Sequence, residues 1–284
     1  MKFIKSQNTD GTPVNLYYED WGSGNPIVFL HGWPLDHQMW EYQMRVLPEM
    51  GFRCIAYDRR GFGKSDKPWN GYDYDALTDD LKAVLDQLDL QNVTLVGFSM
   101  GGGEVVRYFS RYGGARVSKV VLVSSIAPLT MQTDDNPDGV SQEKLDEIAS
   151  QLQTDRAGFL TEFAKKFYGV NLLHHPVSQG TLDWNLTVAM QASPKATLDC
   201  AHSFSETDFR SEMTSITVPT LIIHGDSDQT VPIKATSAKA AQMIPGAEFV
   251  VYEGSPHGLF LTDKERLNAD LIEFVQAPVK SAVL

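Results

Sequence analysis

Short, unbroken apolar runs recur along the chain, at 27–30, 54–57, 93–96, 120–123, 221–223 and 249–252. Runs without polar alternation are typical of strands that are covered on both faces, as in a parallel sheet. The N-terminal segment differs, because Val14, Leu16 and Tyr18 alternate with polar neighbours after a turn signal at 8–11. That segment is therefore predicted to form an antiparallel hairpin.

Helical periodicity occupies several intervals between these runs. One helix is predicted by apolar residues spaced three and four positions apart, at Leu77, Leu81, Val84, Leu85 and Leu88. Similar spacing follows the glycines at 101–103, and two more helices are expected around 235–243 and 267–275. Strands that alternate with helices predict an α/β fold with a mostly parallel, doubly wound sheet.

The interval from 127 to 213 breaks this alternation, because it holds helical and polar stretches but no convincing apolar strand run. We interpret residues 127–213 as a helical cap inserted into a core domain made of residues 1–126 and 214–284. Within the cap, Phe159, Phe163 and Phe167 form an aromatic stripe at helical spacing. Such a stripe is typical of a cap core, with one edge that can line a pocket.

The charge balance narrows the classes of partner. The chain has 24 Lys and Arg against 36 Asp and Glu, a formal net charge of −12, which argues against nucleic acid or an anionic membrane. Two cysteines, Cys54 and Cys200, permit at most one disulfide and cannot build a CxxC metal site. No run approaches the length of a membrane span, and the first residues lack a secretory signal. We expect a cytoplasmic protein that uses no metal and no cofactor.

A candidate nucleophile lies in the segment Gly97-Phe98-Ser99-Met100-Gly101. The G-x-S-x-G pattern alone is weak, but here an apolar strand runs into it and an amphipathic helix leaves it, as a nucleophile elbow requires. Glycines leave room for a sharp, strained turn, and the helix N-terminus favours developing negative charge. The alternative is a glycine-rich turn with an inert serine.

A serine hydroxyl needs a base to take its proton. Of seven histidines, only His257 lies in a loop that follows the last predicted strand, from which it can reach the strand ends. The acid that orients such a histidine is expected after an earlier strand, in the chain order Ser, Asp, His. Asp226 and Asp228 both meet this condition, and spacing alone does not separate them.

The loop after the strand at 27–30 is a candidate oxyanion site. An oxyanion needs two aimed N–H donors, one after the nucleophile and one from an early strand–helix loop, and Met100 and Trp33 would supply them. Gly32 and Pro34 shape this loop, since Pro34 has no N–H and a fixed φ. We interpret His31 as a structural ring bonded to nearby backbone.

Four blocks carry a family resemblance: HGWPLD at 31–36, YDRRGFGKS at 57–65, GFSMGGG at 97–103 and HGDxDxxVP at 224–232. With these blocks the chain resembles the α/β-hydrolase family, and within it the cofactor-free haloperoxidase, perhydrolase and arylesterase group. The resemblance implies the α/β-hydrolase fold and Asp228 as the catalytic acid. It also implies hydrolysis of small-molecule esters through an acyl-enzyme, with water or hydrogen peroxide as acceptor, and a homo-oligomer.

Substrate preference depends on the pocket. We expect Phe98, Phe159 and Trp184 to line it together with Trp33, and to favour short acyl groups. Two alternatives stay open because the same triad serves them. One is a hydrolase of lactones, cyclic amides or C–C bonds, and the other is a small-molecule receptor of this fold with negligible turnover.

Overall fold

The computed structural model describes residues 2–278 and contains an eight-stranded sheet in the order β1-β2-β4-β3-β5-β6-β7-β8. The strands are β1 (Phe3–Gln7), β2 (Pro13–Gly22), β3 (Asn25–Leu30), β4 (Phe52–Tyr57), β5 (Val93–Phe98), β6 (Val117–Val123), β7 (Thr220–Gly225) and β8 (Glu248–Tyr252). The β1–β2 and β2–β4 pairs are antiparallel, and the others are parallel. The predicted hairpin and the predicted parallel strands are therefore confirmed.

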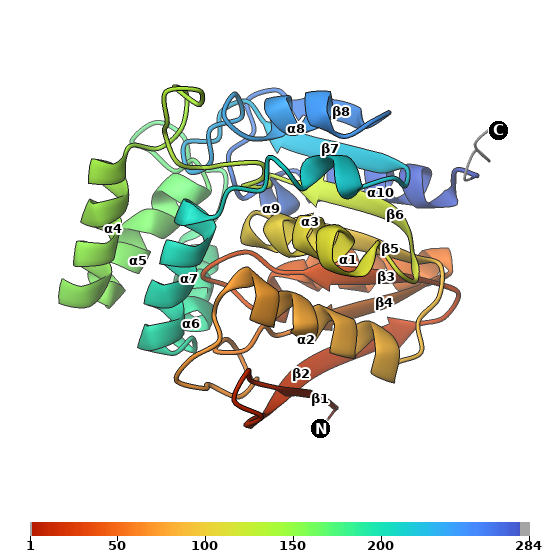
Figure 1. Ribbon diagram of the computed structural model, residues 1–284. Helices are drawn as coiled ribbons and strands as arrows, with labels where there is room; N and C mark the ends of the chain where they lie inside the picture. The colour runs from red at the N-terminus through yellow and green to blue at the C-terminus, as the bar shows by residue number, and fades with distance from the viewer. Residues whose placement is uncertain (1, 279–284) are drawn as a thin grey trace.

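Helices cover both faces of this sheet (Figure 1). The core helices are α1 (Glu41–Val46), α2 (Tyr74–Gln87), α3 (Met100–Tyr112), α8 (Ser237–Met243), α9 (Leu259–Thr262) and α10 (Lys264–Gln276). Helices α2 and α3 pack together on one face, and α1 and α10 pack together on the other. Every residue of β5 is buried between these layers, which explains its unbroken apolar run. Ser99, the residue after β5, is thereby held at the carboxyl end of a central strand of the sheet.

Four further helices lie between β6 and β7: α4 (Gln142–Thr154), α5 (Arg156–Phe167), α6 (Gln179–Met190) and α7 (Pro194–Glu206). In Figure 1 they lie together at the carboxyl ends of the parallel strands. Each begins with a side-chain cap, because its N-cap oxygen accepts from an N–H three residues on, at Ser141, Asp155, Ser178 and Ser193. Such a cap contributes about 1 kcal/mol to helix stability.

Within residues 2–278, no helix combines the length and the apolar character that crossing a bilayer requires. Cys54 and Cys200 are both buried and are not bonded to each other.

Candidate active site

The backbone turns sharply at Ser99, between the end of β5 and the start of α3. Ser99 has φ 52° and ψ −116°, a conformation that a non-glycine residue adopts only under constraint from its surroundings. A Cβ at Gly97 would lie 2.7 Å from the Gly101 carbonyl oxygen, and one at Gly101 would lie 2.6 Å from the Leu30 carbonyl oxygen. The two glycines of the motif are therefore required by close backbone approach.

Three side chains from distant loops form one chain of hydrogen bonds at this turn. The Nε2 atom of His257 lies 3.0 Å from the Ser99 Oγ, and its Nδ1 lies 2.5 Å from an Asp228 carboxylate oxygen. Ser99 is 5% exposed and His257 is 1% exposed, so both residues are largely shielded from solvent. This geometry suits a histidine that takes the Ser99 proton at Nε2 while Nδ1–H donates to Asp228.

The structure separates the two aspartates that spacing left open. Asp228 is in contact with His257, and its other oxygen accepts from the backbone N–H groups of Thr230 and Val231 at 2.7 and 2.8 Å. Asp226 is exposed and accepts from the N–H of Gly254 at 2.7 Å. Asp226 therefore connects two loops, whereas Asp228 is the acid placed next to the histidine.

A second histidine, which the sequence analysis did not assign to the site, also contacts Asp228. The Nε2 of His224 lies 3.1 Å from Asp228 Oδ2 and 3.0 Å from the Val231 carbonyl oxygen, while its Nδ1 lies 2.7 Å from the Ser237 hydroxyl. Burial raises the pKa of Asp228, but His257 and His224 outweigh this effect and hold the pKa well below its usual value. Asp228 therefore stays ionised beside His257.

The loop after β3 lies directly beside Ser99. A Cβ at Gly32 would fall 2.5 Å from the Phe98 ring and 3.2 Å from the Ser99 Cβ, so only glycine lets the loop approach so closely. The indole N–H of Trp33 donates to the Thr197 carbonyl at 2.9 Å, which ties this loop to α7. Within residues 2–278 no hydrogen bond occupies the backbone N–H of Trp33 or of Met100. Both donors remain available to a ligand.

A buried ion pair and its hydrogen bonds hold the loop after β3 in place. The Nε2 of His31 accepts from the backbone N–H of Arg59 at 2.9 Å, and the Arg59 guanidinium donates to the His31 carbonyl at 2.6 Å. Burial lowers the pKa of His31 well below its usual value, and the nearby Arg59 lowers it further. The ring is thus neutral and bonded to backbone. Arg59 in turn forms a buried ion pair with Glu104 of α3, which also accepts from the Tyr57 hydroxyl.

Glu104→Gln is expected to lower the free energy of unfolding by about 3–5 kcal/mol, because it leaves the buried Arg59 charge without its partner. The matched control is Asp199→Asn, which removes a partly exposed ion pair with Lys195 and is expected to cost about 1 kcal/mol or less. Urea unfolding of both variants measures the difference. Equal effects of the two substitutions would mean that the Arg59–Glu104 pair does not anchor the loop.

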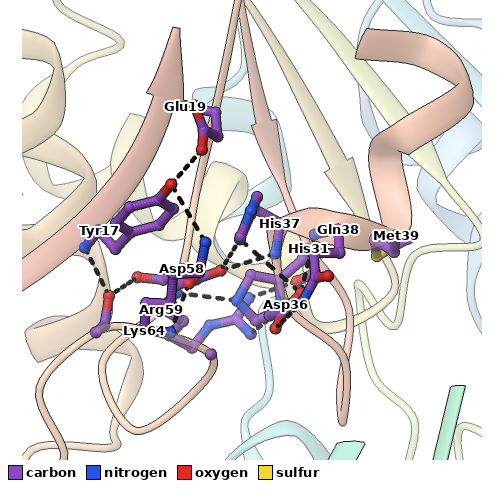
Figure 2. A network of polar contacts seen from close by, with 12 residues as sticks. Tyr17, Glu19, His31, Asp36, His37, Gln38, Met39, Asp58, Arg59 and Lys64 are labelled. Carbon is purple, nitrogen blue, oxygen red and sulfur yellow. Dashed lines mark hydrogen bonds and ion pairs between the residues drawn. The ribbon is translucent and has the colours of Figure 1, made fainter. Parts of the chain in front are cut away.

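A second polar network surrounds Asp58 (Figure 2). Asp58 accepts from the backbone N–H groups of His37 and Lys64, both at 2.8 Å, and lies 2.5 Å from the His37 Nδ1. Asp36, His37 and Asp58 are the one group in residues 2–278 whose spacing could suit a metal ion. Their donor atoms are, however, engaged in these bonds and in bonds from Gln38 to Asp36. The network joins the loop after β3 to the loop after β4.

Ser99 and His257 line a cavity of about 240 Å³ that lies between the carboxyl ends of the strands and helices α4 and α5. Its apolar walls include Trp33, Phe159 and Phe163. The Trp33 ring lies 6.5 Å from Phe159 and 5.3 Å from Phe163, centroid to centroid. One edge of the predicted aromatic stripe therefore lines the pocket, whereas Phe167 is buried against His257 at 4.9 Å.

Two expected pocket residues lie elsewhere. Phe98 is fully buried, and its ring centroid lies 4.9 Å from that of His257. Phe98 therefore packs against the histidine and does not line the cavity. The reason is the alternation of side chains at the end of β5, which turns Phe98 into the core. Trp184 lines a different recess with Met39, Tyr42 and Phe260, because its face of α6 points toward α1 and α9.

Comparison with known proteins identifies the family of this chain. A family model of the alpha/beta hydrolase fold matches residues 25–264. The non-heme chloroperoxidase CPO-A1 of Kitasatospora aureofaciens is 45% identical over 264 residues, 92% of this chain and 96% of that protein. The bifunctional esterase/perhydrolase DCH of Acinetobacter calcoaceticus is 40% identical over 268 residues, 93% of this chain and 97% of that one.

Among solved structures, a bromoperoxidase from Bacillus anthracis matches with a TM-score of 0.93 and 45% identity, and the match covers 97% of this chain and 100% of that one. The similarity thus includes the core, the loops that carry Ser99, Asp228 and His257, and the helices over the cavity. The chain belongs to the α/β-hydrolase family, in the group that contains the non-heme haloperoxidases.

Proposed function

We propose that this protein is a serine esterase for short-chain and aryl esters, and that hydrogen peroxide can replace water as its acyl acceptor. The observation that carries the proposal is the continuous hydrogen-bond chain from Ser99 through His257 to Asp228 at the floor of an apolar cavity. The bifunctional esterase/perhydrolase among the relatives supports both proposed activities, ester hydrolysis and perhydrolysis.

In the first half-reaction, the Ser99 Oγ attacks the ester carbonyl carbon and its proton passes to the Nε2 of His257. The carbonyl oxygen becomes negative and accepts from the N–H groups of Trp33 and Met100. The start of α3 adds the positive end of a helix dipole. As the C–O bond breaks, His257 returns the proton to the leaving alcohol, and the acyl group remains on Ser99.

In the second half-reaction, water gives a proton to His257 and attacks the acyl carbon, which releases the carboxylic acid and restores Ser99. Hydrogen peroxide in the place of water releases a peracid. A peracid can oxidise a halide ion to hypohalous acid and is itself reduced to the carboxylic acid. Halogenation would then follow from acyl transfer, and none of these steps passes through a metal.

Turnover of p-nitrophenyl esters of increasing acyl length, with and without hydrogen peroxide, tests this proposal. We expect the fastest hydrolysis with short acyl groups, because Trp33, Phe159 and Phe163 narrow the cavity. We also expect peracid when peroxide is present. Fastest turnover of long-chain esters would contradict the proposed substrate class, and absence of turnover would favour a receptor.

Pro34→Leu is expected to lower the ratio of perhydrolysis to hydrolysis severalfold. Pro34 is buried next to Trp33, and its fixed φ restricts how the Trp33 carbonyl is oriented in this loop. Peracid formation from acetate and peroxide, compared with ester hydrolysis by the same preparation, gives the ratio. If the ratio does not change, Pro34 has no part in the choice of acceptor.

A further inference from the structure

Two lysines of the cap lie in the wall of the catalytic cavity. Lys144 of α4 and Lys166 of α5 line the same cavity as Ser99 and His257. Most of the remaining wall is apolar, so the few charged groups in it have a large influence on which ligands bind. The whole chain carries a net charge of −12, which repels anions at a distance. Both lysines are also exposed to solvent, so they are cations in the cavity wall whose charge is opposite to the net charge of the protein.

The ion pairs around the cavity leave one of these lysines uncompensated. Lys144 is paired with Glu147 at 2.5 Å, and Glu162, the carboxylate in the cavity wall, is paired with Lys165 at 2.7 Å. Lys166 forms no ion pair within residues 2–278, although it lies on the same helix turn as Lys165. The free charge in the wall is therefore positive and belongs to Lys166.

The surroundings of Lys166 favour an anionic ligand. Burial lowers the pKa of the Lys166 ammonium, and the neighbouring Lys144 lowers it further, while Asp228 acts in the opposite direction. Asp228 is already bonded to His257, His224 and two backbone N–H groups. An incoming carboxylate is thus the group that would relieve the repulsion between the two lysines.

We propose that the preferred substrates of this enzyme carry a carboxylate near the scissile ester, and that Lys166, with Lys144, binds this carboxylate while Ser99 attacks the ester carbonyl. The inference rests on the proposed esterase function and specifies its substrate class. A half-ester of a small dicarboxylic acid, or an acylated hydroxy acid, has this chemistry. The cavity volume of about 240 Å³ restricts such a substrate to a short chain between the two groups.

Two pairs of nearly isosteric esters test the proposal. Monomethyl succinate is compared with methyl levulinate, and acetoxyacetate with acetoxyacetone, so that a methyl ketone replaces the carboxylate in the acyl part or in the alcohol part. The measured quantity is the ratio of kcat/KM for the anionic ester to kcat/KM for its neutral partner, followed by proton NMR. The pair that responds shows on which side of the ester the carboxylate lies.

In at least one pair we expect Lys166→Met to lower this ratio about fivefold, the modest effect of a partly solvated ion pair. Lys166→Glu is expected to lower it further, and 1 M salt to weaken the preference of the wild type, because the Debye length is then about 3 Å. The control is Lys195→Met on α7, because neither Lys195 nor its ion-pair partner Asp199 lines this cavity. It should leave the ratio unchanged.

The outcomes separate this inference from the proposed function. If neutral esters are hydrolysed but Lys166→Met changes neither ratio, the carboxylate preference is wrong and the esterase function stands. The same conclusion follows if Lys195→Met has an equal effect, because the response would then reflect general charge. If the wild type hydrolyses none of the four esters, the carboxylate preference is wrong, and turnover of the p-nitrophenyl esters decides whether the esterase function stands.

Discussion

Ser99→Ala is expected to lower kcat for ester hydrolysis by roughly 10⁴–10⁶-fold, the size of effect seen when a triad nucleophile is removed. The loss is large because the acyl group has no other acceptor oxygen next to the His257 Nε2. KM should change little, since the cavity wall is intact. Initial rates with p-nitrophenyl acetate, corrected for spontaneous hydrolysis, measure the effect.

The control for this substitution is Ser227→Ala, which removes an exposed hydroxyl close to Asp228 in sequence. It should retain wild-type activity. Both variants should unfold at similar urea concentrations, because neither leaves a buried charge unpaired. Appreciable activity in Ser99→Ala would show that another group is the nucleophile.

Asp228→Asn is expected to lower kcat by about 10⁴-fold, because an amide stabilises the wrong tautomer of His257 and cannot balance its positive charge. The neighbouring loop supplies a matched control in Asp226→Asn. Asp226 lies two residues away and bonds the N–H of Gly254, with no contact to His257. That variant should keep activity near the wild-type level, although the lost charge-assisted bond can reduce stability by about 1–3 kcal/mol.

The comparison of these two variants tests the assignment of the acid. Equal losses of activity in both would indicate that the shape of the loop matters more than the carboxylate of Asp228. A large loss in Asp226→Asn alone would reverse the assignment. Because the pKa of Asp228 is held well below its usual value, the contribution of its charge should persist into mildly acidic solution.

Local patterns were sufficient to predict the sheet and the nucleophile turn. The run at 93–96 became the fully buried β5, and the glycines around Ser99 are required by backbone contacts under 3 Å. These features depend on residues close together in the sequence. The choice between Asp226 and Asp228 depends instead on how the two loops after β7 and β8 face each other, so local spacing left it open and only the family resemblance implied Asp228.

Other parts of the site lay beyond sequence reasoning for the same reason. Trp184 was expected in the pocket, but periodicity does not say which face of α6 meets the cavity. The contact of Arg59 with Glu104 joins residues 45 positions apart, and only the tertiary fold determines it. The contact of His224 with Asp228 spans four residues and depends on the turn that the chain makes after β7. The DRR sequence after β4 and the histidine of HGD were visible, but their partners were not.

The most direct test of the account is the mass of the protein after reaction with a fluorophosphonate, followed by peptide mapping. Such reagents trap an activated serine, and the hydrogen-bond chain to His257 and Asp228 singles out the oxygen at position 99. The account predicts one added group for each chain, attached to Ser99, and loss of esterase activity in parallel. Modification of a different residue, or an unchanged mass, would contradict it.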